Sequence, residues 1–345
     1  MATFPDGCTA PPVALVEGGE LNLGRWTGPL AQTNLLDLRY RGLPRPLRWW
    51  RLKEWQAVQI ATPTLFANIA LVDTKLVTMV QIKAYDRARG VKHLHERKLR
   101  PGALRLTDQL IDSRAAYADR TSRLAFTNQL ARGRVEVELD VRAHGGGPAM
   151  RGRFTLATDA GAAQVVNLPF THGSVYSHKG LFPVTGALTI GDQRHDLDGA
   201  VATLDDHKAY YPYTMQYDWV TSLWRGADGR ARGFNLTRNQ CLEPERYNEN
   251  CAWLGDQVAS LPAVTFTRER EGAPGERWLV RDRAGQVDLV FEPTVPGDVR
   301  LNLGVIESRY RGPFGRCHGR LAPAGMPALV VDDQFGMGED FWLRG

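Results

Sequence analysis

Residues 134–142, RVEVELDVR, decide the fold class of this chain. The apolar residues Val135, Val137, Leu139 and Val141 alternate strictly with charged ones. Successive side chains of an extended chain point to opposite faces. This period of two therefore predicts a strand with one face on a core and the other in water.

Segments on both sides of this stretch show related patterns. Apolar residues share one face of residues 76–85. Residues 186–190 and 195–202 flank the turn residues Gly191 and Asp192, which predicts a hairpin, and residues 221–224 and 233–236 predict a second one. Residues 104–123 are the best candidate for a helix.

Short strands joined by turns, in a chain with 35 glycines and 20 prolines, predict an all-β antiparallel sandwich or barrel. A single barrel of 345 residues would be unusual, so we expect two similar barrels. We place an N-terminal arm at residues 1–45, the first barrel at 46–192 and the second at 193–345.

The net charge is +5, but Lys and Arg are interleaved with Asp and Glu, so we expect no nucleic-acid partner. The exception is residues 45–56, RPLRWWRLKEWQ, which could stack bases or lie on a membrane surface. We favour a first strand whose tryptophans pack in a core. No apolar run reaches the length of a membrane span, and the first residues lack signal-peptide features, so we expect a cytoplasmic protein without stable membrane insertion.

Residues 204–213, LDDHKAYYPY, place titratable groups beside aromatic ones, as a ligand pocket that moves protons requires. On a strand, Asp206 and Lys208 share one face, while Asp205 and His207 share the other. A poorly solvated Asp206 would be a general acid. If Lys208 neutralises Asp206, the pair is a buried structural ion pair instead.

Two further clusters could contribute to this site. Residues 234–253 are rich in amides, which either fix loops or orient a substrate, and Glu249 lies among them. The C-terminal residues 332–344 add carboxylates. The catalytic candidates are Asp206, His207 and Glu249; the substrate-binding candidates are Asp205, Lys208, Tyr211, Tyr213, Trp219, Asn235, Asn250, Glu339 and Asp340.

Metal and cofactor signatures are missing from the sequence. The four cysteines are scattered at spacings that fit no metal site, and the pair His93 and His95 lacks a third ligand. There is no glycine loop for phosphate and no serine nucleophile motif. We therefore expect no metal and no cofactor.

The phrases DDHKAYYPY, GFNLTRNQ, ERYNENCAW, SRYRGPFG and FGMGEDFWLR resemble a bacterial family catalogued as domain of unknown function 2804. The resemblance covers about residues 48–344. That family is distantly similar to carotenoid 1,2-hydratase and AttH-like proteins. The resemblance implies two consecutive lipocalin-like antiparallel β-barrels with few short helices and an apolar cavity.

Three functions follow as hypotheses for a pocket that takes a small, largely apolar molecule. In a hydratase-, lyase- or isomerase-type enzyme, Asp206 would protonate an alkene or enol ether, and Tyr211 and Tyr213 would stabilise the cation. In a non-catalytic protein, the same tyrosines would hold a lipid or isoprenoid. In a carbohydrate-active enzyme, paired carboxylates would act beside some of the nine tryptophans.

Overall fold

The computed structural model describes residues 8–144, 147–302 and 307–344, and most of them lie in strands. Up to Tyr210 the elements are β1 (Val16–Glu17), β2 (Glu20–Leu21), β3 (Gly24–Trp26), the 3-10 helices η1 (Leu35–Asp37) and η2 (Tyr40–Gly42), α1 (Arg45–Arg51), β4 (Leu52–Ala61), β5 (Leu65–Asp73), β6 (Thr78–Asp86), β7 (Val91–Leu99), β8 (Ser113–Ala118), β9 (Ser122–Gln129), η3 (Leu130–Arg132), β10 (Arg134–Val141), β11 (Met150–Ala157), β12 (Ala162–Phe170), β13 (Gly173–Ile190), β14 (Gln193–Asp196) and β15 (Ala200–Tyr210).

The remaining strands follow residue 213. They are β16 (Thr214–Arg225), β17 (Ala231–Arg238), β18 (Cys251–Leu254), β19 (Gln257–Ser260), β20 (Thr265–Glu269), β21 (Arg277–Arg281), β22 (Val287–Val295), β23 (Asp298–Asn302), β24 (Glu307–Arg311), β25 (Phe314–Leu321) and β26 (Leu329–Arg344). None of the helices in the described ranges is long and apolar enough to cross a membrane.

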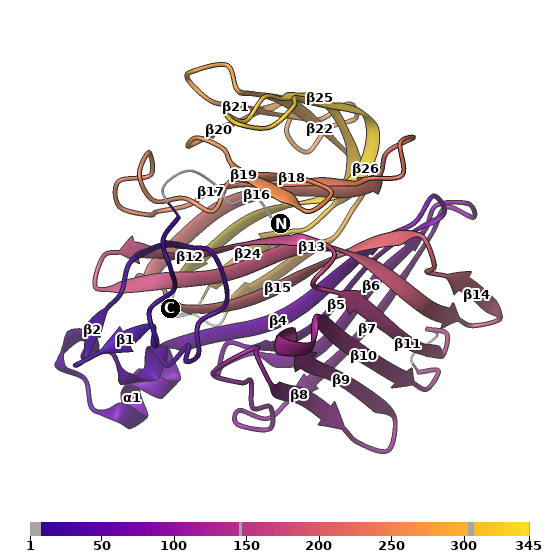
Figure 1. Ribbon diagram of the computed structural model, residues 1–345. Coiled ribbons are helices and arrows are strands. Elements are labelled where there is room, and N and C mark those ends of the chain that lie inside the picture. Colours follow the sequence, from indigo (N-terminus) through magenta and orange to yellow (C-terminus); the bar gives the residue numbers. More distant parts are fainter. Residues whose placement is uncertain (1–7, 145–146, 303–306, 345) are drawn as a thin grey trace.

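Two large antiparallel sheets make up the molecule, and each curls into a half-barrel of the lipocalin-like kind expected for the fold class (Figure 1). The first sheet has the order β7-β6-β5-β4-β15-β13-β11-β10-β9-β8, and β12, β14 and β3 extend it. The second has the order β19-β18-β17-β16-β26-β25-β22-β21-β20, with β24 and β23 added beside β26. The orange and yellow strands of the second sheet lie above the first sheet in Figure 1.

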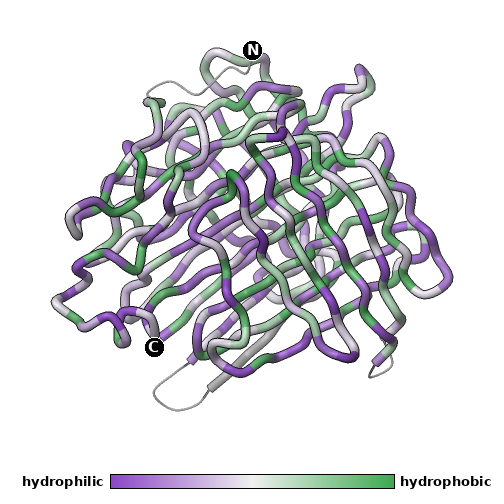
Figure 2. The backbone as a smooth tube through the Cα atoms, turned by 60° about the horizontal axis from the view of Figure 1, so that its bottom comes forward, coloured by the Kyte–Doolittle hydropathy of each residue, from purple (hydrophilic) through white to green (hydrophobic). Residues whose placement is uncertain are grey.

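Hydrophobic and hydrophilic residues alternate along the strands, as the green and purple segments show, so that one face of each sheet packs on a core (Figure 2). In β10, Val135, Val137 and Val141 are buried, whereas Arg134 and Asp140 are exposed, which confirms the predicted strand. One cluster of buried residues fills the first half-barrel and another fills the second. A third cluster lies between the two sheets.

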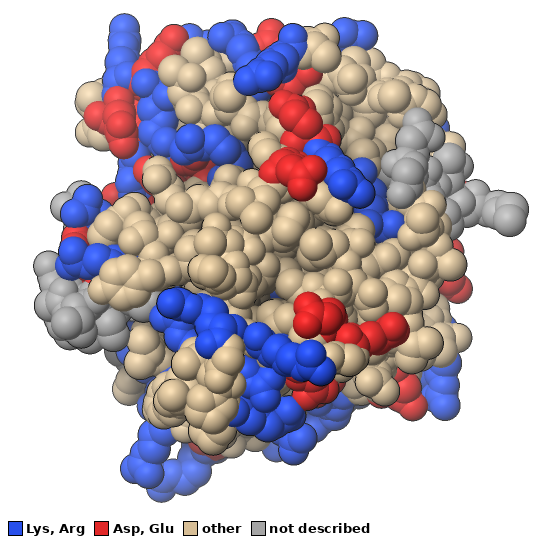
Figure 3. All heavy atoms as spheres, turned by 90° about the vertical axis from the view of Figure 1, so that its left-hand side faces the viewer, with Lys and Arg blue, Asp and Glu red and all other residues tan. Residues whose placement is uncertain are grey.

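The N-terminal segment packs against the first sheet. Its residues Leu15, Trp26 and Tyr40 are buried in a cluster with Tyr176 and Tyr210. Because β3 pairs with β12, this segment also adds a strand to the sheet. Charged side chains of both signs lie near one another on the face shown in Figure 3, around a band of uncharged residues.

The chain passes from the first sheet to the second between β15 and β16, at residues 211–213. The predicted hairpin around Gly191 is confirmed, since Ile190 pairs with Gln193. However, β14 pairs with β13, and β15 lies between β13 and β4, so residues 193–210 belong to the first sheet. The division into an arm and two domains stays a prediction.

One local prediction is wrong and another is right only in part. Residues 104–123 contain no helix, and instead a loop is followed by β8 and the start of β9. Leu104, Leu106 and Leu110 of that loop reach into the first core, which explains the misleading apolar spacing. Of the strand expected over residues 45–56, residues 52–56 do begin β4, but residues 45–51 form the short helix α1, where Trp50 is 43% exposed.

Candidate functional site

The surface between the two sheets, here called the seam, carries the candidate site. On the side of the first sheet the seam contains Leu181 and Val201, and on the side of the second it contains Trp219, Leu223 and Trp253. This apolar packing surrounds a group of buried polar side chains. A contact between two half-barrels is a common position for a ligand site.

β15 supplies the candidate residues and divides them between its two faces. Within the strand, Asp205 and His207 point to the seam, whereas Asp206 and Lys208 point to the interior of the first half-barrel. The contacts agree with this division: Asp205 pairs with Lys179 at the seam, and Lys208 pairs with Glu54 on the other face. The predicted alternation of DDHK is therefore present.

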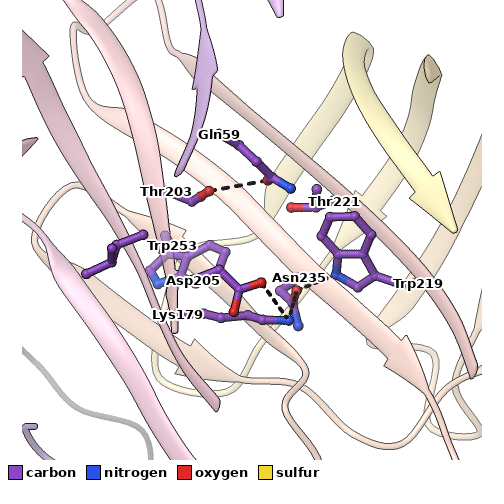
Figure 4. Close-up of a pocket in the computed structure, with 9 residues that line it drawn as sticks. Gln59, Lys179, Thr203, Asp205, Trp219, Thr221, Asn235 and Trp253 are labelled. Atoms are coloured by element: carbon purple, nitrogen blue, oxygen red, sulfur yellow. Dashed lines mark hydrogen bonds and ion pairs between the residues drawn. The ribbon is translucent and has the colours of Figure 1, made fainter. Parts of the chain in front are cut away.

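A small cavity lies in the seam, here called the seam cavity. Its volume is about 10 Å³, enough for one water molecule. Figure 4 shows Lys179, Asp205 and Asn235 pointing toward one another in this cavity. The lining residues are Gln59, Lys179, Thr203, Leu204, Asp205, Trp219, Thr221, Asn235 and Trp253. By residue type the lining is mostly polar and aromatic.

Lys179 connects the two sheets. From β13 its Nζ lies 3.7 Å from Asp205 Oδ2 in the first sheet and 3.0 Å from Glu249 Oε2 in the loop that leads into β18 of the second. It also donates to Asn235 Oδ1 at 3.3 Å. Although burial disfavours the ammonium ion, the two carboxylates raise the pKa of Lys179 above its usual range. Lys179 is therefore a permanent cation.

Asp205 has the properties of an acid that exchanges its proton near neutral pH. Burial raises the pKa of Asp205 to about 6, although Lys179 opposes the rise. Its Oδ1 is buried and has no hydrogen-bond partner. A hydrogen bond from Trp55 also opposes the rise in pKa. A carboxyl of this kind is partly protonated near pH 7.

His207 is buried next to this group as a neutral ring. Burial lowers the pKa of His207 well below its usual value, and Lys179 adds to the effect. The ring stacks on Trp55 with centroids 3.6 Å apart, and its Nε2 shares a hydrogen bond of 3.0 Å with the Tyr211 hydroxyl. His207 therefore does not carry the proton of an imidazolium acid at neutral pH.

Asp206, the expected acid, faces away from the seam cavity. Burial raises the pKa of Asp206 to about 7. Lys208 forms its ion pairs with Glu54 at 2.6 Å and with Asp108 at 3.3 Å. Among the described residues Lys208 thus pairs with Glu54 and Asp108 and not with Asp206, which was the alternative to a catalytic Asp206, although its charge still lowers the pKa of Asp206.

The two C-terminal carboxylates, Glu339 and Asp340, also lie in different surroundings. Glu339 accepts hydrogen bonds from the hydroxyls of Tyr217, at 2.8 Å, and Tyr310, at 2.6 Å. Lys83 of the first sheet donates to Tyr310 at 2.8 Å, so this group also bridges the sheets. Asp340 instead lies 3.4 Å from Arg268, away from the seam cavity.

The amide residues have two different roles. Asn235 lines the seam cavity, accepts from Trp219 Nε1 at 2.6 Å and donates to the Glu249 carbonyl at 2.8 Å. Asn250 does not line it, and instead accepts from the Thr237 N–H at 2.7 Å and donates to the Pro262 carbonyl at 2.8 Å. Asn250 thus fixes the loop that carries Glu249.

We expect Asn250→Ala to lower the free energy of unfolding by about 1–3 kcal/mol, because it leaves a buried N–H and a buried carbonyl without partners. Chemical denaturation measures the loss. Asn239→Ala, which removes an acceptor for the Cys241 N–H in a partly exposed loop, is the matched control with a smaller effect. Wild-type stability in Asn250→Ala would contradict the structural role.

The structure brings together Asp205, Trp219, Asn235 and Glu249 of the predicted residues. Tyr213 is 56% exposed between β15 and β16 and does not reach the seam. The sequence reasoning missed Lys179, the central cation. The available signal was a single lysine within GSVYSHKGLFPV, a mostly apolar strand segment.

Comparisons with known proteins give a family and a fold. A family model described as "Domain of unknown function (DUF2804)" matches residues 8–344. CghA aligns with a TM-score of 0.51 at 12% identity, covering 84% of this chain and 87% of that chain. Kievitone hydratase from Nectria haematococca aligns with a TM-score of 0.46 at 13% identity, covering 85% of this chain and 89% of that chain. A protein described as an AttH from Nitrosomonas europaea aligns with a TM-score of 0.42 at 14% identity, covering 84% of this chain and 92% of that chain. No curated protein matches the chain. The likeness to CghA concerns the fold and transfers no residue role.

Proposed function

The chain belongs to the DUF2804 family, as its motifs predicted, and because that description assigns no activity, we propose from the seam itself that the protein is an acid–base enzyme acting on a small molecule. In this proposal Asp205 is the proton donor. The observation that carries it is a buried carboxyl whose pKa is raised to about 6 and whose Oδ1 has no partner, at a cavity the size of one water.

The chemistry that suits this arrangement is addition of water to a double bond, or the reverse. The Asp205 carboxyl gives its proton to one alkene carbon, and the π electrons form the new C–H bond. A water held in the seam cavity uses an oxygen lone pair to bond the other carbon, and its proton returns to Asp205. Loss of a neighbouring proton in place of water capture would shift the double bond.

Residues around Asp205 support this role. Trp219 and Trp253 line the cavity, and aromatic ring faces stabilise developing positive charge. Glu249 balances the charge of Lys179 at 3.0 Å, so the lysine does not impose an uncompensated cation on the site. The seam cavity itself holds a water and no more, so the rest of a substrate must occupy neighbouring space.

The carbohydrate hypothesis has less support. Asp205 and Glu249 both lie against Lys179, at 3.7 and 3.0 Å, and carboxylates paired to one cation are not positioned to flank a glycosidic bond. Binding without chemistry uses the same residues and is separated from catalysis by experiment.

We expect the wild-type protein, incubated in D₂O with a bacterial small-molecule extract, to produce compounds carrying carbon-bound deuterium or added water, detected by mass spectrometry. Asp205→Asn should reduce their formation at least about a hundredfold, because the amide has no titrating proton. Asp140→Asn, an exposed carboxyl on β10, is the control that keeps the activity.

Two outcomes would overturn the proposal. If Asp206→Asn abolishes labelling and Asp205→Asn does not, the acid is on the other face of β15. If the wild type labels nothing and instead retains an unchanged compound from the extract, the protein is a binding protein.

A further inference from the structure

A second pocket opens at the edge of the seam, here called the edge pocket. Its volume is about 230 Å³, and Arg25, Asn248 and Ser260 are among its lining residues. Arg25 comes from β3 of the first sheet and Ser260 from β19 of the second, and β12, the neighbour of β3, packs near β19. The edge pocket therefore lies where the two sheets meet at one border.

The register of the first sheet places Arg25 on the seam face. Arg25 is opposite Val166, Val166 is opposite Ser177, and Ser177 is opposite His207. Directly opposed residues of antiparallel strands point to the same face. His207 points to the seam, so the Arg25 side chain does as well.

The second sheet places Ser260 in the matching position. Ser260 is opposite Cys251, Cys251 is opposite Asn235, and Asn235 lines the seam cavity. The hydroxyl of Ser260 thus faces the seam from the opposite sheet. Arg25 also spans the two sheets directly, since its Nη2 donates to the Asn248 carbonyl at 3.1 Å.

Polar atoms at this edge lack partners. Arg25 Nε and Ser260 Oγ are both buried without a hydrogen bond. Burial lowers the pKa of Arg25, and the groups that oppose it are the thiols of Cys8 and Cys251, with no carboxylate of the described residues among them. A desolvated guanidinium with an N–H to spare, beside a hydroxyl, is suited to an anionic oxygen group.

Unpartnered polar atoms continue from the edge pocket toward Asp205. Gln164 of β12 is opposite Lys179 of β13, and both atoms of its side-chain amide are buried without partners. From β3 through β12 and β13 to β15, which carries Asp205, there are three strand spacings, about 14 Å. A molecule of at least this length could contact Arg25 at one end and Asp205 at the other.

We propose that the edge pocket binds the acidic group of the substrate, a carboxylate or a phosphate, through Arg25 and Ser260, and that the substrate extends past Gln164 to Asp205. The pocket's Glu245 is exposed and therefore screened by solvent, so it does not cancel the charge of Arg25. The reaction at Asp205 rests on the proposed function, whereas binding of the anion at Arg25 does not.

The test compares octanoate, octanamide and octyl phosphate in titration calorimetry with the full-length protein. Octanoate or octyl phosphate should bind at least tenfold more tightly than octanamide, and the tighter of the two identifies the anion. Arg25→Met should abolish this preference and leave octanamide binding unchanged. Arg39→Met, an exposed arginine of the same N-terminal segment, should keep it.

Arg25→Lys is the second variant, because it keeps the charge and loses the planar fork, and it should retain only part of the preference. Equal binding of acid and amide, no measurable binding of either acid, or an unchanged preference in Arg25→Met would overturn the proposal. Asp205→Asn should bind octanoate like the wild type. Loss of labelling in that variant with an intact preference supports both proposals. Unchanged labelling with an intact preference would overturn only the reaction at Asp205, whereas loss of labelling in a protein whose wild type shows no preference would overturn only the anion site.

Discussion

Replacing Lys179 with methionine is expected to lower the free energy of unfolding by about 3–5 kcal/mol at pH 8. The Lys179 ammonium lies between Asp205 and Glu249, and all three side chains are largely buried. Methionine fills similar space but leaves two buried carboxylates facing each other without a cation. Because these come from different sheets, the seam itself loses its central bridge.

The pH dependence of this loss distinguishes charge from packing. The charge of Lys179 lowers the pKa of Asp205, so removing it raises this pKa. The carboxyl then binds a proton at higher pH than in the wild type. The variant should therefore recover part of its stability between pH 8 and pH 5. Urea unfolding at both pH values measures this recovery.

Two comparisons control the Lys179 experiment. Lys98→Met, at an exposed position of β7, should change the stability by no more than about 0.5 kcal/mol. Adding Glu249→Gln to Lys179→Met should restore stability relative to the single variant, because one uncompensated charge is removed. A single variant as stable as the wild type would show that Lys179 is not a buried bridge.

The fold could be predicted from the sequence where a pattern is local. The alternation in RVEVELDVR and the turn at Gly191 both depend on near neighbours in the chain, and both are present in β10 and in the β13–β14 hairpin. The segment around Leu106 failed because its leucines enter the core from a loop, and spacing alone does not separate such a loop from a helix.

The site could be predicted only in part, because its charges pair across the two sheets. The DDHK stretch identified Asp205, but Lys179 meets Glu249, which lies 70 residues further along the chain in the loop before β18 of the other sheet. Alternation assigned Asp206 and Asp205 to opposite faces correctly and could not show which face carries the cavity. That choice depends on how the sheets pack, which no local pattern records.

The two faces of β15 therefore hold two carboxyls with raised pKa values and different surroundings. At the seam, Asp205 has a cation at 3.7 Å and a cavity. On the inner face, Asp206 lies opposite His178, whose pKa is lowered to about 4 by burial, so the ring brings no charge. Lys208 lowers the pKa of Asp206, but Asp205, Glu54 and Asp108 raise it in addition to burial.

Asp206→Asn is expected to stabilise the protein relative to the wild type as the pH rises. The pKa of Asp206 is about 7 in the folded chain against 3.8 for an ordinary aspartate, so between these values the folded state holds a proton that the unfolded state has released. The free energy of unfolding of the wild type then falls with rising pH, by at most about 1.4 kcal/mol per pH unit from this group. Asparagine cannot ionise, so the variant lacks this decline.

The measurement is the difference in unfolding free energy between Asp206→Asn and the wild type at several pH values from 4 to 8. Near pH 4 both side chains are neutral and similar in shape, so the difference should be within about 1 kcal/mol. By pH 8 the free energy of unfolding of the variant should exceed that of the wild type by on the order of 4 kcal/mol. Other groups titrate in both proteins and cancel. Asp140→Asn, at an exposed site, should show a nearly constant difference. A constant difference for Asp206→Asn would mean that Asp206 is ionised in the folded protein like an exposed aspartate, and that the inner face of β15 supplies a counter-charge.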